Sequence, residues 1–176
     1  GMGFAVRHPE RVSHLVVLNT AAFLFRTCPW RIRICRTPLF GDLAVRGLNG
    51  FARGALRMAV MHRERLTPAV RQGYLAPYDS VDHRIANLEF VKDIPLKPKH
   101  RTWPVLIEIE KRLSLLSDHP MNIYWGDRDF CFTKKFLDKW RRYFPQAEVH
   151  RFSDAGHYVL EDAHERILPL IRDFLS

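Results

Sequence analysis

Three short apolar runs predict the strands of a parallel sheet. Residues 14–20 form a continuous run rich in Val and Leu, residues 121–125 form a second run that ends at Gly126, and residues 147–152 form a third. Short runs without polar alternation are typical of strands that are covered on both faces. The pattern therefore favours a sheet with helices on each side.

Helical spacing follows the second and the third run. Behind Thr133, a potential N-cap, apolar residues recur at helical spacing: Phe136, Leu137, Trp140, Tyr143 and Phe144. After the third run, Asp162 and Glu165 form a capping pattern, and we expect Pro169 to kink the final helix. Alternating strands and helices predict an α/β fold, a doubly wound parallel sheet of about three strands with right-handed crossovers.

About 100 residues without a strand pattern separate the first two runs. Proline, glycine, threonine and serine delimit five predicted helices, at residues 39–52, 54–62, 68–75, 80–91 and 104–116. A helical insertion at the ligand-binding side of an open sheet is typical of a cap. We therefore expect three regions: the start of the core at 1–20, a helical cap at 21–117 and the rest of the core at 118–176.

The positive charge of the chain is concentrated in the predicted cap. The 176 residues carry a net charge of +9, and the stretch from Arg26 to Arg71 holds ten arginines against Asp42 and Glu64, which gives 10 − 2 = +8. The remaining 18 basic and 17 acidic residues nearly cancel, so we expect no nucleic-acid partner. The alternation of arginine and apolar residues over 30–36 fits a solvated cap face best, with a docking patch or a membrane-surface segment as alternatives.

Composition excludes several other classes of protein. With 47% hydrophobic and 27% charged residues the chain is of ordinary globular composition, and no apolar run approaches the roughly 18 residues of a membrane span. The first ten residues lack the pattern of a secretion signal, and three cysteines without metal-ligand spacing fit a reducing cytoplasm. His150, His157 and His164 share no face, so we expect neither a metal nor another cofactor.

An acid and a histidine follow the last two predicted strands. Asp129 lies in the loop after the second strand and His157 in the loop after the third, where open sheets place their catalytic groups. Asp then His is the order of an α/β-hydrolase relay, in which the carboxylate orients an imidazole that acts as base. Asp127 competes with Asp129 for the role of the acid; the resemblance given next favours Asp129 and implies that Asp127 is a turn residue. Asp154 is expected to hold its own turn.

These two loops resemble those of a known family. The runs Trp-Gly-Asp-Arg-Asp-Phe (125–130) and Phe-Ser-Asp-Ala-Gly-His-Tyr-Val-Leu-Glu-Asp (152–162) are similar to the acid and histidine loops of the haloalkane-dehalogenase-like branch of the α/β-hydrolase superfamily. Residues 3–12 resemble the helix after the nucleophile turn, and residues 18–23 the strand after that helix. The cap stretches 76–80, 83–86 and 91–95 resemble most the β-lactone decarboxylases of bacterial olefin synthesis.

The resemblance implies the C-terminal half of a hydrolase that cleaves a carbon–halogen, ester or lactone bond of a small apolar substrate. Its nucleophile, usually Asp, would precede the helix that here begins at Gly1, so we expect the chain alone to be inactive; a non-catalytic interaction module is the alternative. Asn19 occupies the place of an alternative acid in some relatives but cannot ionise. The cap would contribute pocket residues, namely Leu39, Phe40, Leu43, Leu48 and Phe51.

The first predicted strand would lie at an edge of this sheet. In the strand order of the family, its second neighbour is the nucleophile strand, which the chain lacks. Residues 14–20 carry no charged residue or proline to protect such an edge. We therefore expect a homodimer through the strand His14 to Thr20.

Overall fold

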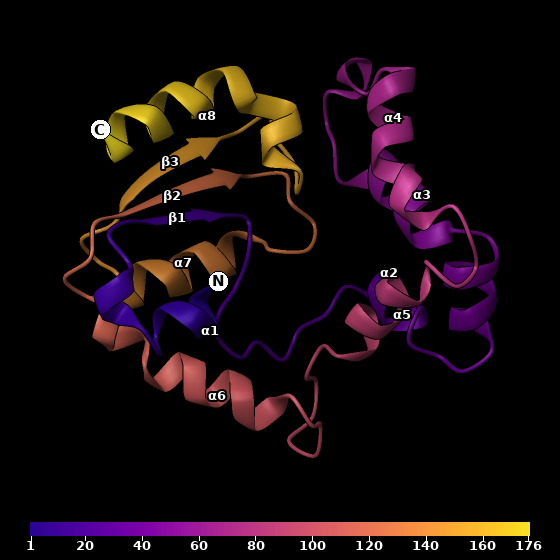
Figure 1. Cartoon of the computed structure of the whole chain (residues 1–176), viewed down its shortest axis with the longest axis horizontal. Helices are drawn as coiled ribbons and strands as arrows, with labels where there is room; N and C mark the ends of the chain where they lie inside the picture. Colours follow the sequence, from indigo (N-terminus) through magenta and orange to yellow (C-terminus); the bar gives the residue numbers. More distant parts are fainter.

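A three-stranded parallel sheet forms the centre of the larger lobe. The computed structural model describes residues 1–176, and the sheet has the order β1 (Leu15–Leu18), β2 (Met121–Gly126), β3 (Glu148–Phe152) (Figure 1). All three strands run parallel, so their carboxyl ends lie at the same end of the sheet. The predicted strands and their parallel arrangement are confirmed.

Helices cover both faces of the sheet. One face carries α8 (Val159–Leu175), and the other carries three helices: α1 (Met2–Ala5), α6 (Trp103–Lys111) and α7 (Lys134–Tyr143) (Figure 1). The side chains of β2 alternate between these layers, with Trp125 packed in the cluster of α7 and Tyr124 in the cluster of α8. Both faces of the sheet are thus buried, which explains the uninterrupted apolar runs.

The cap forms a second lobe beside the sheet (Figure 1). Its α-helices are α2 (Trp30–Ile34), α3 (Gly50–Met58), α4 (Pro68–Leu75) and α5 (Ile85–Lys92). Shorter turns complete the chain: η1 (Pro9–Arg11), the π-helical η2 (Asp42–Gly47), η3 (Arg63–Arg65), η4 (Ala76–Tyr78) and η5 (Leu113–Leu116). None of the helices has the length and apolar character required to cross a bilayer.

The cap helices differ from the sequence prediction in several places. The helix predicted at 68–75 is confirmed, but the one at 39–52 is interrupted by Asn49, whose φ of 53° is left-handed and ends the preceding turn. The helix predicted at 54–62 ends at Met58, and the one at 80–91 begins only at Ile85. These breaks depend on backbone conformations that apolar spacing does not report.

The last predicted cap helix packs with the sheet instead. Residues 104–116 divide into α6 and η5, and Leu113 and Leu116 are fully buried in the same cluster as Trp125 and Trp140. Ile109 of α6 packs against this cluster as well. In the structure the cap lobe therefore ends before Trp103, not at residue 117.

Helix α8 begins and bends at other residues than predicted. It starts at Val159, and the distortion lies at Ala163 (φ −146°) rather than at Pro169. Asp162 does not cap this helix. Its fully buried carboxylate instead accepts hydrogen bonds from backbone N–H groups outside the helix. The prediction that Asp162 caps the final helix is therefore wrong.

The Asp162 carboxylate joins the cap to the loop that precedes α8. Its Oδ1 accepts the N–H groups of Met61 (2.9 Å) and His62 (2.8 Å), and its Oδ2 accepts the N–H of Gly156 (2.7 Å). Beside it, Tyr158 donates its N–H to Ala59 O at 2.9 Å. The loop between β3 and α8 is thus fixed against the cap on both sides of residue 157.

Strand β1 lies at the edge of the sheet, as predicted. It pairs only with β2, and an apolar groove runs along β1 and α1. Self-association through the strand His14 to Thr20 stays a prediction.

We expect Asp162→Ala to lower the free energy of unfolding by at least about 3 kcal/mol, because the backbone N–H groups of Met61, His62 and Gly156 lose their acceptor at roughly 1 to 3 kcal/mol each. Urea unfolding measures this change. Glu161→Gln is the matched control on the same turn, since Glu161 makes only an exposed contact with Tyr74, and it should change stability by less than about 1 kcal/mol. Equal effects of the two substitutions would contradict this account of Asp162.

Candidate active site

The two predicted site residues meet at the carboxyl end of the sheet. Asp129 follows β2 and His157 follows β3, and Asp129 Oδ2 lies 2.8 Å from His157 Nδ1. The predicted hydrogen bond is therefore present. The Asp129 side chain is wholly inaccessible to solvent, whereas 27% of the His157 side chain is exposed. The pair thus has a buried acid and an accessible imidazole.

The Asp129 carboxylate is held by four N–H donors. Its Oδ1 accepts the backbone N–H groups of Cys131 (2.6 Å) and Phe132 (3.0 Å), and its Oδ2 accepts Asn19 Nδ2 (2.9 Å) in addition to His157. An ionised carboxylate offers acceptors only, so this set of donors suits the charged form. The imidazole then donates through Nδ1 and leaves Nε2 without a proton in its neutral form.

Asn19 also belongs to this site, although the sequence analysis gave it no role beyond the place of an alternative acid in some relatives. It ends β1 and is buried, with Nδ2 also donating to Gly126 O (3.1 Å) and Oδ1 accepting Gly126 N (2.7 Å). The amide therefore joins the ends of β1 and β2 while it orients Asp129. Its φ of 26° is in the left-handed region, which asparagine adopts more readily than most residues. Its position at a strand end, where some relatives carry an alternative acid, was the signal in the sequence.

The competing acids lie outside this arrangement. Asp127 forms an ion pair with Arg151 at 3.0 Å, and this hydrogen bond raises the pKa of Arg151. Asp154 contacts Arg166 and His62, and the hydrogen bond from Arg166 holds the pKa of the Asp154 carboxyl below its ordinary value. Neither carboxylate contacts His157. Asp129 is therefore the partner of the histidine.

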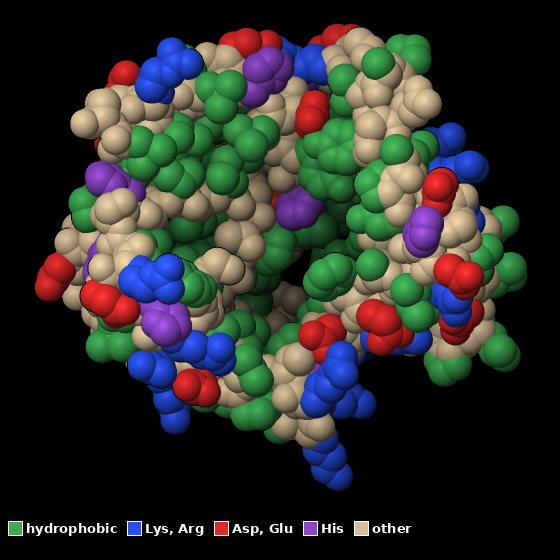
Figure 2. All heavy atoms as spheres, in the orientation of Figure 1, with side chains coloured by type: hydrophobic (Ala, Val, Ile, Leu, Met, Phe, Trp, Pro, Cys, Tyr) green, Lys and Arg blue, Asp and Glu red, His purple; other side chains and the backbone are tan.

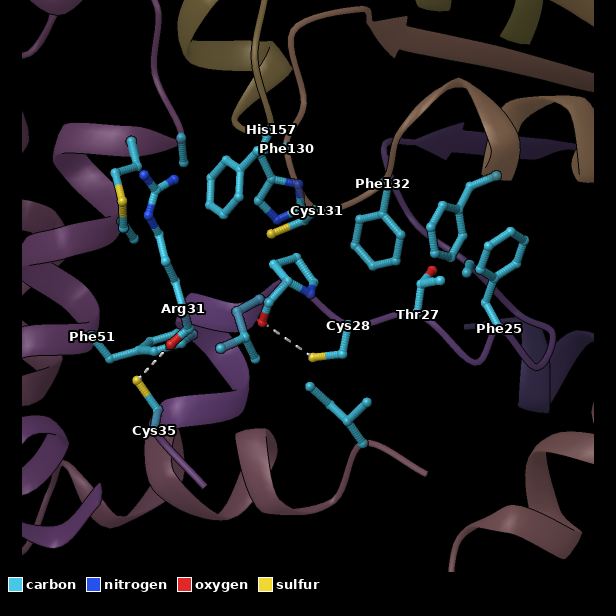
Figure 3. A pocket seen from close by; sticks show the side chains of 18 of the residues that line it. Phe25, Thr27, Cys28, Arg31, Cys35, Phe51, Phe130, Cys131, Phe132 and His157 are labelled. Atoms are coloured by element: carbon cyan, nitrogen blue, oxygen red, sulfur yellow. Dashed lines mark hydrogen bonds between the residues drawn. The ribbon is translucent and has the colours of Figure 1, made fainter. Parts of the chain in front are cut away.

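An apolar cavity of about 410 Å³ opens beside His157, between the sheet and the cap. Figure 2 shows a hollow between the two lobes that is surrounded by hydrophobic side chains. Seventeen of the 23 lining residues are hydrophobic. In Figure 3 aromatic side chains lie around this space, Phe51 and Phe130 on the side of Arg31 and Phe25 and Phe132 on the other. The cavity suits a ligand that is largely hydrocarbon.

Only one of the five predicted pocket residues lines this cavity. Phe51, on α3, contributes to its wall. The other four are exposed and do not line it: Leu39, Phe40, Leu43 and Leu48. The break of the helix at Asn49 separates these four residues from α3.

Several of the lining residues that the sequence analysis missed follow the ends of strands. Phe23 and Phe25 come after β1, and Phe130 and Phe132 flank the loop of Asp129. Aromatic residues directly after a strand are a signal that could have identified them, because ligands bind at that end of an open sheet. The cap wall carries no comparable signal.

The other histidines of the seven-residue series lie elsewhere. His150 stacks on Tyr124 with ring centroids 4.9 Å apart, and His164 Nδ1 lies 3.1 Å from Leu160 O. No group of three or more His, Cys, Asp or Glu side chains is arranged to hold a metal ion.

Two known decarboxylases are similar to this chain in sequence. The chain is 42% identical to the cis-3-alkyl-4-alkyloxetan-2-one decarboxylase of Shewanella oneidensis and 44% identical to that of Xanthomonas campestris pv. campestris. Both matches cover the whole chain, which spans 56% and 59% of the length of these relatives.

Solved structures of haloalkane dehalogenases share the fold. The DbeA enzyme of Bradyrhizobium elkani matches with a TM-score of 0.81 at 18% identity, over 98% of this chain and 63% of its own. The DatA enzyme of Agrobacterium tumefaciens matches with a TM-score of 0.82 at 20% identity, over 99% of this chain and 62% of its own. In addition, the α/β hydrolase fold family matches residues 2–164. The chain therefore belongs to the α/β hydrolase family.

Proposed function

We propose that this chain supplies the acid–histidine pair and the apolar cavity of an enzyme that opens and decarboxylates a β-lactone with alkyl substituents. The observation that carries the proposal is the 2.8 Å contact between Asp129 Oδ2 and His157 Nδ1 beside a cavity lined mainly by hydrophobic side chains. The two relatives above 40% identity are named for a reaction of this class.

The geometry supports a base at Nε2 of His157. Since Nδ1 faces the Asp129 carboxylate, Nε2 carries the free electron pair and can take a proton from water or from a hydroxyl group. Asp129 then stabilises the imidazolium that forms. The 27% exposure of the His157 side chain leaves this nitrogen open to a reactant.

The nucleophile of this reaction is not assigned to a residue of this chain. The resemblance to haloalkane dehalogenases implies a carboxylate, but no Asp or Glu side chain lines the cavity. No side chain of the chain is hydrogen-bonded to Nε2 of His157, whose one hydrogen bond is to Asp129. We therefore propose that His157 acts on water or on an ester intermediate formed elsewhere in the site.

Cys131 lines the same cavity but is unsuited to this role. Burial, followed by the nearby charges of Asp129 and Cys28, raises its pKa from an ordinary 9.0 to about 12. A thiol with this pKa stays protonated at neutral pH, and only the thiolate is an effective nucleophile.

We expect Cys131 to react slowly with iodoacetamide in the folded protein at about pH 8, at least about 100-fold more slowly than after unfolding in urea. Because the folded pKa is raised, the rate should increase about tenfold per pH unit well above neutrality. Peptide mass spectrometry separates this residue from Cys35. Alkylation of folded Cys131 at the rate of a free thiol would contradict the assignment.

The proposed activity can be tested in a chimera. The part of the Shewanella oneidensis relative that this chain does not match would be joined to residues 1–176, and loss of CO₂ from a cis-3,4-dialkyloxetan-2-one would be followed. We expect turnover by the chimera, a loss of about 10⁴-fold in kcat with Asp129→Asn and about 10⁶-fold with His157→Ala. Residues 1–176 alone should show no turnover.

Asp127→Asn is the matched control, because this acid lies in the same loop but pairs with Arg151. It should leave kcat within about threefold of the parent chimera. A folded chimera that hydrolyses haloalkanes but not β-lactones would contradict the proposed substrate class. A folded chimera with no turnover of either would favour the non-catalytic alternative, and turnover that survives His157→Ala would contradict the role of His157 as the base.

A further inference from the structure

The wall of the apolar cavity contains one permanently charged side chain. Arg31, on α2, is the only Lys, Arg, Asp or Glu among the 23 lining residues. Figure 3 shows its side chain extending from α2 along the cavity, with the guanidinium on the side where Phe130 and His157 lie. A cation in an otherwise apolar wall calls for a physical explanation.

The guanidinium of Arg31 has no protein partner. It forms no ion pair and donates no hydrogen bond within the chain, and its Cζ lies 5.3 Å from the centroid of the Trp30 ring. Arg36, just beyond the end of α2, donates to Val91 O (3.0 Å) and Ile94 O (2.6 Å) instead. Arg36 has a structural role, whereas the donors of Arg31 remain available to a ligand.

We propose that Arg31 binds the anionic head group of an amphipathic ligand whose hydrocarbon part occupies the cavity. The planar guanidinium matches a carboxylate through two parallel hydrogen bonds. Next to apolar walls the attraction between opposite charges is stronger than in bulk water. The ligand class is therefore a long-chain carboxylate, or a neutral ester that develops negative charge on oxygen as it reacts.

This inference deepens the proposed function and rests on it for the identity of the substrate. Cleavage of either carbon–oxygen bond of an oxetan-2-one ring leaves the bonding electron pair on the ring oxygen, as an alkoxide or as part of a carboxylate. A cation at the cavity wall is complementary to that charge. The binding of a stable carboxylate, however, does not depend on turnover.

The test compares two ligands that differ in charge and share a chain length, decanoate and 1-decanol, by isothermal titration calorimetry at about pH 8, above the range in which histidine is usually charged. We expect the protein to bind decanoate about tenfold or more tightly than 1-decanol. Arg31→Met should remove this preference while it leaves the affinity for 1-decanol within about threefold. Arg31→Lys should restore part of the preference.

Arg33→Met is the matched control, because Arg33 is exposed on the same short helix, as Arg31 is, but does not line the cavity. It should retain the preference for decanoate. Equal affinities for the two ligands in the unsubstituted protein, or equal losses with Arg31→Met and Arg33→Met, would overturn the proposal. A chimera without lactone turnover would disprove the proposed reaction. The proposal for Arg31 would still stand if the preference for decanoate is lost with Arg31→Met and kept with Arg33→Met.

Discussion

The arrangement of the site depends on one buried carboxylate. Asp129 accepts hydrogen bonds from its own loop, from Asn19 at the end of β1 and from His157 in the loop after β3. A buried carboxylate is costly unless its oxygens are satisfied, so these elements are held together by the same requirement. The sheet brings the loops to one end, and the acceptor capacity of Asp129 fixes their side chains.

A second buried carboxylate gives the histidine loop its other support. Asp162 binds Gly156 on one side and the cap at Met61 and His62 on the other. Gly156 is required there, because a Cβ at this position would lie 2.6 Å from Ala59 O. His157 is therefore oriented from the sheet through Asp129 and from the cap through its two chain neighbours. Asp162 thus holds both the cap, which forms one wall of the cavity, and the loop of His157. The shape of the binding site is therefore coupled to the position of the proposed base.

The sequence predicted those features that depend on neighbours along the chain. The three strands, helix 68–75 and the placement of Asp129 and His157 follow from local apolar patterns and from the rule that sites lie beyond strand ends. The contacts of Asn19 and Asp162 join residues about 100 positions apart, and the break at Asn49 depends on a left-handed backbone. The spacing of apolar residues indicates neither the long-range contacts nor the left-handed residue. The predicted bounds of most cap helices, and four of the five predicted pocket residues, therefore differ from the structure.

The most direct test of the acid–histidine relay is the tautomer of His157, read from long-range ¹H–¹⁵N correlations of its neutral imidazole. The account predicts a proton on Nδ1 and none on Nε2. In Asp129→Asn the N–H groups of Cys131 and Phe132 should retain the amide oxygen and turn the NH₂ group toward His157, which moves the imidazole proton to Nε2. A proton on Nε2 before substitution, or a tautomer unaffected by Asp129→Asn, would contradict the relay.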